Sequence, residues 1–541
     1  MPESPLTFDS RRSPVYARHG MVASSQPLAS EARIEILRRG GNAADAAVAT
    51  AAMLALTEPT STGLGGDCFA LFYDGASGKI TALNGSGRAP QGLTLDLLRD
   101  QGFGDALPPY HAHNITVPGA CAGWCDLIER HGSLEMEDIL APAVRAAEEG
   151  FPVAPITAYY WAGGAKRQLG SALGGGQLLL DGRAPKAGDI FRSPGLARTF
   201  RAIAAGGKAA FYRGDIATRI AAAVQASGGV LTAEDLAAHH STWDEPISTA
   251  YRGLRLWECP PNGQGIVALL ALNLLSRFDL PADALGPGRL HLLIEALRLA
   301  FADARRYVAD PTKADVPTRA LLDPDYAAER ARGIDLRKAN PEASPGSMKA
   351  GPDTVYFSVV DGSGNACSFI NSNYMGFGTG IVPEGTGFPL QNRGANFSLD
   401  PRHPNVLAPG KRPYHTIIPG MATREGNGSL YACFGVMGGF MQPQGHVQVL
   451  LALLDGIDPQ AALDRPRICL DEGEPGGTVL VEEGIPEATR NDLGRCGHRI
   501  QTITGQERAV FGRGQVILRD AATGVLCGGS DPRADGCALG Y

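Results

Sequence analysis

The apolar residues of the first 340 positions recur mainly at helical spacing. Residues 29–39 carry them on one face and stop at Gly40-Gly41, a common helix end. Asn42 is placed to cap a second helix, 43–56, which is built almost wholly of alanine and other small apolar residues. Residues 115–240 are also expected to be mainly helical. A long amphipathic helix follows, and its apolar face consists of Leu290, Leu293, Ile294, Leu297, Phe301 and Val308.

Short runs rich in β-branched and aromatic residues predict strands, and they become more frequent toward the C-terminus. They cover residues 68–73, 79–84, 245–258, 355–361, 366–370 and 431–437. The first two runs, and likewise 355–361 and 366–370, are separated by short turns containing glycine, which predicts two hairpins. Helices and strands in one chain of 541 residues predict an α/β (α+β) fold, either as two to four domains or as one large layered domain.

The junction between Asp353 and Thr354 separates two contrasting segments. Residues 337–353 are rich in Pro, Gly, Ser and Lys, as expected of a mobile linker, whereas a buried strand is predicted directly after Thr354. Two interpretations are open: an ordinary boundary between loop and strand, or a site of self-cleavage that makes Thr354 a new N-terminus. In the second case the free α-amine, which titrates near neutrality, provides a base beside the threonine hydroxyl.

Two other features supply the groups that such a nucleophile needs. Gly438-Gly439 at a strand end offers two unhindered backbone N–H groups, the kind of donor that stabilises a tetrahedral intermediate. Ser372 in the neighbouring predicted strand offers a hydroxyl that can hydrogen-bond the nucleophile. The sequence alone does not bring these groups together in space.

Charge and cysteine usage limit the partners and the compartment. A net charge of −7 argues against nucleic acid or an anionic membrane as the main partner, because both require clustered positive charge. The longest strongly apolar run, 266–275, is far shorter than the roughly 20 residues that span a bilayer. No secretory signal pattern is visible, and the ten cysteines are scattered without a C-x-x-C pair. A cytoplasmic protein with no membrane partner is therefore expected.

Three further motifs have both a structural and a functional interpretation. The glycine-rich loop 61–67 follows a helix and lacks the lysine of a phosphate-binding loop, so a close approach of backbones is favoured. Arg88, at a glycine-rich strand exit, is either a surface arginine or a binding group for a substrate carboxylate. Two histidine pairs lack neighbouring metal ligands and are expected in loops, namely His111 with His113 and His239 with His240.

The chain resembles the γ-glutamyltransferase family of N-terminal nucleophile hydrolases over nearly its whole length. The motifs that carry the resemblance are residues 20–30, 40–46, Gly65-Gly66-Asp67, Pro118-Gly119, Thr354, Gly378-Thr379-Gly380, Lys411-Arg412-Pro413, Gly438-Gly439 and 530–533. The resemblance implies a four-layer αββα fold and a precursor that cleaves itself before Thr354. The products would be a large, mainly helical subunit of residues 1–353 and a small subunit of residues 354–541.

The resemblance also implies the reaction and the partners. Acyl transfer would proceed through an ester of Thr354, without a metal or an organic cofactor. The expected partners are a small-molecule amide and the two subunits themselves, as one pair or as a dimer of such pairs. In this alignment Thr354 matches the nucleophile, Ser372 the residue that hydrogen-bonds it, and Gly438 and Gly439 the oxyanion hole. Arg88 matches the arginine that binds the substrate carboxylate.

The expected substrate pocket departs from the family pattern. Asn396 stands where the family has an acidic residue for the glutamyl α-ammonium, and Arg393 replaces its polar neighbour. Tyr374 replaces an asparagine that contacts substrate, and His415-Thr416 replaces a serine pair that grips the α-carboxylate. A cationic α-amine would lose a salt bridge worth ~1.5–3 kcal/mol if desolvated. An anionic acyl group without that amine would gain from the added positive charge.

Three functions are therefore compared. The first is hydrolysis or transfer of a γ-glutamyl-type acyl group, as in glutathione hydrolases. The second is hydrolysis of a small anionic amide, as in the divergent branch of the family that includes oxamate amidohydrolase, and Asn396 and Arg393 favour it. The third is an inactive scaffold, which the presence of Thr354, Gly438 and Gly439 disfavours.

Overall fold

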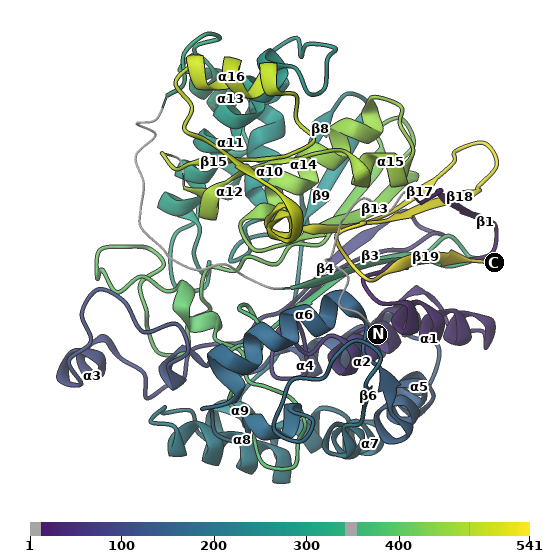
Figure 1. Ribbon diagram of the computed structural model, residues 1–541, viewed down its shortest axis with the longest axis vertical. Helices are drawn as coiled ribbons and strands as arrows, with labels where there is room; N and C mark the ends of the chain where they lie inside the picture. The colour runs from purple at the N-terminus through teal and green to yellow at the C-terminus, as the bar shows by residue number, and fades with distance from the viewer. Residues whose placement is uncertain (1–11, 341–353, 475) are drawn as a thin grey trace.

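Two seven-stranded antiparallel sheets lie face to face at the centre of the protein, in a computed structural model that describes residues 12–340, 354–474 and 476–541 (Figure 1). The predicted linker from residue 341 onward and Asp353 lie outside the described residues. The first sheet contains, in spatial order, β1 (Val15–Ala17), β18 (Leu526–Ser530), β17 (Arg513–Arg519), β13 (Leu430–Met437), β12 (Gly420–Arg424), β9 (Leu254–Glu258) and β8 (Ile247–Tyr251). The second contains β19 (Cys537–Gly540), β2 (Met21–Ser24), β10 (Val355–Val360), β11 (Ala366–Ser372), β3 (Asp67–Tyr73), β4 (Ile80–Gly85) and β7 (Thr242–Asp244).

Helices cover the outer face of each sheet, as Figure 1 shows. The second sheet packs through one apolar cluster against α1 (Pro27–Arg38), α2 (Ala43–Thr57), α4 (Ala120–His131), α5 (Met136–Glu149), α6 (Pro155–Gly164), α7 (Pro194–Tyr212), α8 (Asp215–Ala226) and α9 (Ala233–Ala237). The first sheet packs through another against α10 (Gly265–Leu275), α11 (Pro287–Tyr307), α14 (Met441–Leu454) and α15 (Pro459–Asp464). A third cluster fills the space between the sheets. The four-layer αββα arrangement predicted from the resemblance is confirmed.

Smaller elements complete the chain around this sandwich. They are the helices α3 (Leu95–Asp100), α12 (Thr318–Leu321), α13 (Pro324–Ala331) and α16 (Glu487–Arg495), a sheet of β14 (Ile468–Leu470), β15 (Val479–Glu482) and β16 (Ile500–Ile503), and a pair of β5 (Phe151–Pro152) with β6 (Ile190–Phe191). None of the helices in the described ranges has the length and apolar character that crossing a membrane requires.

Local sequence signals explain the elements that carry the site. Asn42 caps α2 in a capping box with Asp45, and every residue of α2 is buried, since its small side chains pack closely between sheet and helices. The two predicted hairpins are present as β3–β4 and β10–β11. A Cβ on Gly66 would lie only 2.2 Å from the carbonyl oxygen of Ser372, so the glycine-rich loop does approach another backbone closely. That close approach fixes the end of β11 against β3.

Each sheet contains strands from both sides of the Asp353–Thr354 junction. β10 pairs with β2, which precedes the junction, and with β11, which follows it. In the other sheet, β12 lies between β9 and β13. A cut at the junction would therefore leave two chains that share one hydrophobic core, although the division into residues 1–353 and 354–541 remains a prediction.

Candidate active site

Thr354 directly precedes β10 and is fully buried beside Ser372, the last residue of β11. Val355 pairs with Asn371 in the β10–β11 register, so Thr354 stands opposite Ser372 across the two strands. Their hydroxyl oxygens are 3.0 Å apart. The strand pairing itself thus creates the contact that the sequence motifs suggested.

Two donors orient the Ser372 hydroxyl. The backbone N–H of Tyr374 donates to Ser372 Oγ at 2.9 Å, and Nη2 of Arg393 donates to it at 3.1 Å. Either hydroxyl of the Thr354–Ser372 pair can be the donor in their contact. The two donors therefore hold Ser372 Oγ in place beside Thr354 Oγ1.

Arg393 lies at the centre of the buried polar network. Besides Ser372, it donates through Nη1 to Thr416 Oγ1 at 2.7 Å, and its guanidinium carbon lies 4.4 Å from the centre of the Tyr374 ring. Burial lowers the pKa of Arg393 to about 10, although Asp67 opposes the shift, so the side chain stays charged at neutral pH. A cation therefore lies in hydrogen-bond contact with the hydroxyl pair of Thr354 and Ser372.

The glycine pair follows β13, which faces β10 from the other sheet. Ser358 on β10 donates to the carbonyl oxygen of Cys433 on β13 at 3.0 Å, which fixes the two strands relative to one another. Gly438 and Gly439 have φ angles of 128° and 57°, which favour glycine. Neither N–H donates to an acceptor in the part of the chain that the structure describes. These two donors are thus available to a ligand.

Gln264, at the start of α10, connects this turn to the arginine network. Its side-chain N–H group donates to the carbonyl oxygens of Thr416 and Gly439, each at 2.7 Å. Hydrogen bonds link Thr354 to Ser372, Arg393 and the Thr416 hydroxyl. The backbone carbonyl of Thr416 continues this connection through Gln264 to Gly439.

His415 forms a buried pair with Asp67 instead of facing a ligand alone. Its Nε2 lies 3.0 Å from Asp67 Oδ2, while Asp67 Oδ1 accepts hydrogen bonds from Gly87, Gly119 and Gln391. Burial, together with the positive charge of Arg393, lowers the pKa of His415 to about 3, although Asp67 opposes the shift. Burial alone would raise the pKa of Asp67, but the hydrogen bond and charge of its partners outweigh burial and lower it. At neutral pH the pair is a neutral imidazole donating to an ionised carboxylate.

Two predicted substrate-binding residues lie outside this network. Arg88 is half-buried, and its guanidinium donates to the carbonyl oxygen of His240 at 3.2 Å and lies 3.3 Å from the His240 ring nitrogen Nε2. Asn396 is fully buried in the same short 3₁₀ turn as Arg393, and neither side-chain atom of its amide has a hydrogen-bond partner among the described residues. The amide of Asn396 is thus a buried polar group that a ligand would satisfy.

Sequence reasoning missed Asp67, Gln264 and Gln391 as members of the network. Asp67 was visible only as part of the Gly65-Gly66-Asp67 motif, and no sequence signal indicated its contact with His415, which is 348 positions away. Gln264 directly precedes α10, and the sequence gives no sign of the direction in which its side chain points. Each of these contacts depends on tertiary structure.

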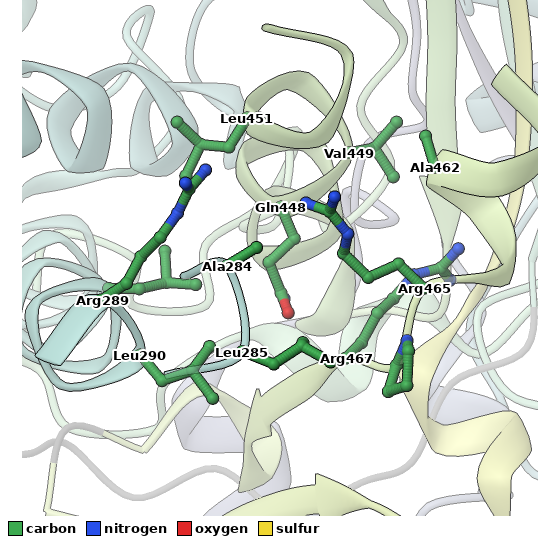
Figure 2. Close-up of a pocket in the computed structure, with 12 residues that line it drawn as sticks. Ala284, Leu285, Arg289, Leu290, Gln448, Val449, Leu451, Ala462, Arg465 and Arg467 are labelled. Carbon is green, nitrogen blue, oxygen red and sulfur yellow. The ribbon is translucent and has the colours of Figure 1, made fainter. Parts of the chain in front are cut away.

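One group of described residues has the composition of a metal site, and it shares no residue with this network. It consists of His291, Glu295 and His498, all buried. A separate open pocket lies between α11, α14 and α15 (Figure 2). Of its arginines, Arg289 and Arg465 pair with Asp455, and Arg467 pairs with Asp531, so each already has a carboxylate partner. No predicted site residue lines that pocket.

Known proteins resemble this chain in sequence and in fold over nearly its whole length. The family model Gamma-glutamyltranspeptidase matches residues 29–541. The chain is 37% identical to the glutathione hydrolase-like YwrD proenzyme of Bacillus subtilis (strain 168), over 96% of this chain and 98% of that protein. It is 35% identical to the oxamate amidohydrolase proenzyme of Klebsiella pneumoniae subsp. pneumoniae, over 97% of this chain and 98% of that protein.

The solved structures agree with the sequence comparison. The crystal structure of cephalosporin acylase from Bacillus halodurans matches with a TM-score of 0.92 and 47% identity, covering 100% of this chain and 99% of that one. The similarity therefore extends through both sheets and all four layers, and it includes the segment on each side of Thr354. The resemblance inferred from the motifs is confirmed: the chain belongs to the γ-glutamyltranspeptidase family.

Proposed function

We propose that the chain is a self-cleaving threonine amidohydrolase that acts through an acyl ester of Thr354. The observation that carries this proposal is the buried Thr354 hydroxyl, which lies 3.0 Å from the oriented hydroxyl of Ser372. Relatives along the full chain are named proenzymes, which supports a precursor that is cut. Burying a charged arginine beside a hydroxyl pair costs free energy of folding, and an inactive scaffold would gain nothing from it.

Self-cleavage and catalysis use the same oxygen. In the precursor, Thr354 Oγ1 attacks the carbonyl carbon of Asp353, the peptide C–N bond breaks as the amine takes a proton, and an ester forms. This shift frees the α-amine of Thr354, and water then hydrolyses the ester, which restores the Thr354 hydroxyl and releases the carboxylate of Asp353. The free amine is a base beside the same hydroxyl.

In the mature enzyme the α-amine takes the Thr354 proton as Oγ1 attacks the substrate amide. Ser372 donates a hydrogen bond to the attacking oxygen, and the N–H groups of Gly438 and Gly439 are the proposed donors to the oxyanion. The amine product leaves with the proton, and the acyl group remains on Thr354. Water hydrolyses the ester, or a second amine accepts the acyl group.

The charges of the pocket favour an acyl group that ends in a carboxylate and lacks an α-ammonium. Arg393 is a buried cation, and Asn396 stands where an acidic partner for an ammonium would be expected. Asp67 is the carboxylate whose charge acts on Arg393, but both of its oxygens are already hydrogen-bonded. A small anionic amide such as oxamate fits these features best, and the oxamate amidohydrolase relative supports the same class.

Hydrolysis or transfer of a γ-glutamyl group is the second candidate. It is supported by the glutathione hydrolase-like relative and by Arg88, the residue matched to a carboxylate-binding arginine. For this substrate the α-ammonium would have to bind without a salt bridge to residue 396. We therefore expect γ-glutamyl amides to react slowly.

A pair of matched substrates tests the proposal, because glutaryl p-nitroanilide and γ-glutamyl p-nitroanilide differ only in the α-ammonium. Release of p-nitroaniline from each, together with release of ammonia from oxamate, should be measured for wild type and for Thr354→Ala. We expect at least ~10-fold higher kcat/KM without the ammonium, corresponding to the loss of one salt bridge. A preference for the γ-glutamyl compound would reject the anionic-amide assignment, and activity that survives in Thr354→Ala would reject the nucleophile.

A further inference from the structure

Three buried side chains with metal-binding atoms meet where α11 lies beside the loop that follows α16. His291 and Glu295 are four residues apart on α11, so they lie on the same face of the helix. His498 reaches them from the loop, with its Nε2 2.8 Å from His291 Nδ1. One ligand atom from each of the three residues lies within 4.8 Å of the others.

A second hydrogen bond fixes the orientation of the His291 ring. Its Nε2 lies 2.7 Å from the carbonyl oxygen of Asp335, which can only accept, so Nε2 carries the hydrogen. In the neutral ring, Nδ1 then carries no hydrogen, and its lone pair points into the cluster. A backbone carbonyl behind a histidine is the usual support for a metal-ligating imidazole.

Two other atoms of the cluster lack hydrogen-bond partners among the described residues. They are Glu295 Oε1 and His498 Nδ1, each buried in a residue that is no more than 4% exposed. The second oxygen of Glu295 accepts from the backbone N–H of Asn340 at 3.1 Å, which fixes the carboxylate in place. A buried carboxylate oxygen without a donor is costly, and a metal ion would satisfy it.

The three residues of the cluster come from both sides of the Asp353–Thr354 junction. His291 and Glu295 precede Thr354, whereas His498 follows it. The same region holds the last described residues before position 341, because the N–H of Ala339 donates to the carbonyl oxygen of Cys496 at 2.7 Å. A ligand here would therefore join the two segments that self-cleavage would separate.

We propose that His291, Glu295 and His498 bind a divalent transition metal ion of the zinc class and thereby tie α11 to the segment that follows Thr354. Two imidazoles and one carboxylate suit Zn²⁺, Co²⁺ or Ni²⁺, whereas Ca²⁺ and Mg²⁺ prefer a set made of oxygens. When the ion binds, the hydrogen on His498 Nε2 moves to Nδ1, so no net proton is released by the histidine pair. Water would complete the coordination.

Arg298 limits the affinity of this site. Its Nε lies 3.8 Å from Glu295 Oε1, and its positive charge opposes that of a dication. We therefore expect binding in the micromolar range, weaker than that of a structural site with four ligands. The proposal is independent of the catalytic one, since no residue of the cluster belongs to the Thr354 network.

Metal binding by the full-length protein tests the inference directly. After treatment with EDTA and buffer exchange, the protein is titrated with Zn²⁺ by calorimetry and with Co²⁺ by visible absorption. Wild type should bind one ion per chain, with Co²⁺ bands of low coordination number, and Zn²⁺ should raise the melting temperature. Thr354→Ala, which stays uncleaved under the proposed function, should bind the metal equally well.

Two variants and one control complete the test. Glu295→Gln keeps the size of the side chain and an acceptor for Asn340, and His498→Gln removes the third ligand; each should weaken Zn²⁺ binding at least tenfold and abolish the Co²⁺ bands. His19→Gln, at an exposed histidine outside the cluster, should bind like wild type. The proposal is overturned if wild type binds no ion with one-to-one stoichiometry, or if Glu295→Gln, folded by circular dichroism, binds as tightly as wild type.

Discussion

Arg393 donates a 3.1 Å hydrogen bond to Ser372, the hydroxyl that contacts Thr354. The same guanidinium donates to Thr416 and stacks on Tyr374, so one planar group with two directed donors holds both the hydroxyl pair and the segment before β12. Lysine has the same charge in one compact ammonium group, so it cannot replace a planar guanidinium whose N–H donors have fixed directions. Replacing Arg393 by lysine leaves the net charge of the protein unaltered, yet it should disturb the hydroxyl pair of Thr354 and Ser372.

Arg393→Lys should therefore lower kcat/KM for a carboxylate-bearing amide by ~10- to 100-fold, the loss expected for one charge-assisted hydrogen bond. Initial rates with glutaryl p-nitroanilide give the measurement. Arg402→Lys is the matched control, because Arg402 is exposed and pairs with neighbouring Asp400. Equal rates for Arg393→Lys and wild type would show that the fork does not orient the nucleophile.

Self-cleavage can be followed on a denaturing gel. Wild type should yield two bands, whereas Thr354→Ala should remain a single band near 56.6 kDa. Ser372→Ala should still cleave but more slowly, because it removes the hydroxyl beside Thr354 and leaves the attacking Thr354 oxygen in place. Mass spectrometry of the small chain should give Thr354 as its first residue. A wild-type protein that stays uncleaved would refute the precursor model.

The sequence predicted what depends on local patterns. The Asn42 cap of α2, the β10–β11 hairpin and the strand that stops just before Gly438-Gly439 follow from spacing and turn chemistry, and the structure contains each of them. These features need only a few consecutive residues. The contact of Thr354 with Ser372 was not predicted from local patterns, because it depends on the register in which β10 and β11 pair.

The directions of long polar side chains in loops could not be predicted. Arg88 and Arg393 were both predicted to bind substrate. In the structure Arg88 donates to the carbonyl oxygen of His240, whereas Arg393 donates to the hydroxyl of Ser372. His415 was expected to face the substrate, and it is paired with Asp67. In each case the partner comes from a distant segment, so packing and burial decide the orientation.

Residue 396 should control whether an α-ammonium is accepted. Asn396→Asp places a carboxylate in the same volume, so the kcat/KM ratio of γ-glutamyl to glutaryl p-nitroanilide should rise about 10-fold or more, through one buried salt bridge. Asn427→Asp, in an exposed turn, changes the net charge equally and should leave the ratio unchanged. A constant ratio in Asn396→Asp would place the ammonium subsite elsewhere.

The glycine turn should tolerate no side chain. Gly438 has a φ of 128°, and a Cβ there would lie 3.1 Å from the Cα of Gly512, so Gly438→Ala must shift the turn and its N–H groups. We expect kcat to fall ~100- to 1,000-fold, as for loss of an oxyanion donor. Gly428→Ala is a matched control, since its φ is also positive, at 68°, but no atom would meet the new Cβ within 4 Å. A similar small effect in both variants would exclude an oxyanion role for Gly438.

Acid should destabilise the fold through His415. Its pKa is about 3 in the folded protein, against about 6.5 for an unperturbed histidine. Between these values the unfolded chain binds a proton that the folded chain does not, so the free energy of unfolding decreases as pH falls from about 6.5 toward 3. The contribution of this one residue reaches at most about 1.4 kcal/mol per pH unit in that window.

His415→Gln keeps a donor for Asp67 but cannot titrate, so it should flatten the acid side of the stability curve. Urea unfolding of the uncleaved Thr354→Ala chain between pH 7.5 and 4.5 measures this, with the variant losing about 2–3 kcal/mol less than its parent. His19→Gln, at an exposed position, should follow the parent curve. The remaining slope in His415→Gln should come from other histidines whose pKa burial lowers, such as His239, at about 3. A curve as steep as that of the parent would show that His415 is already protonated in the folded protein.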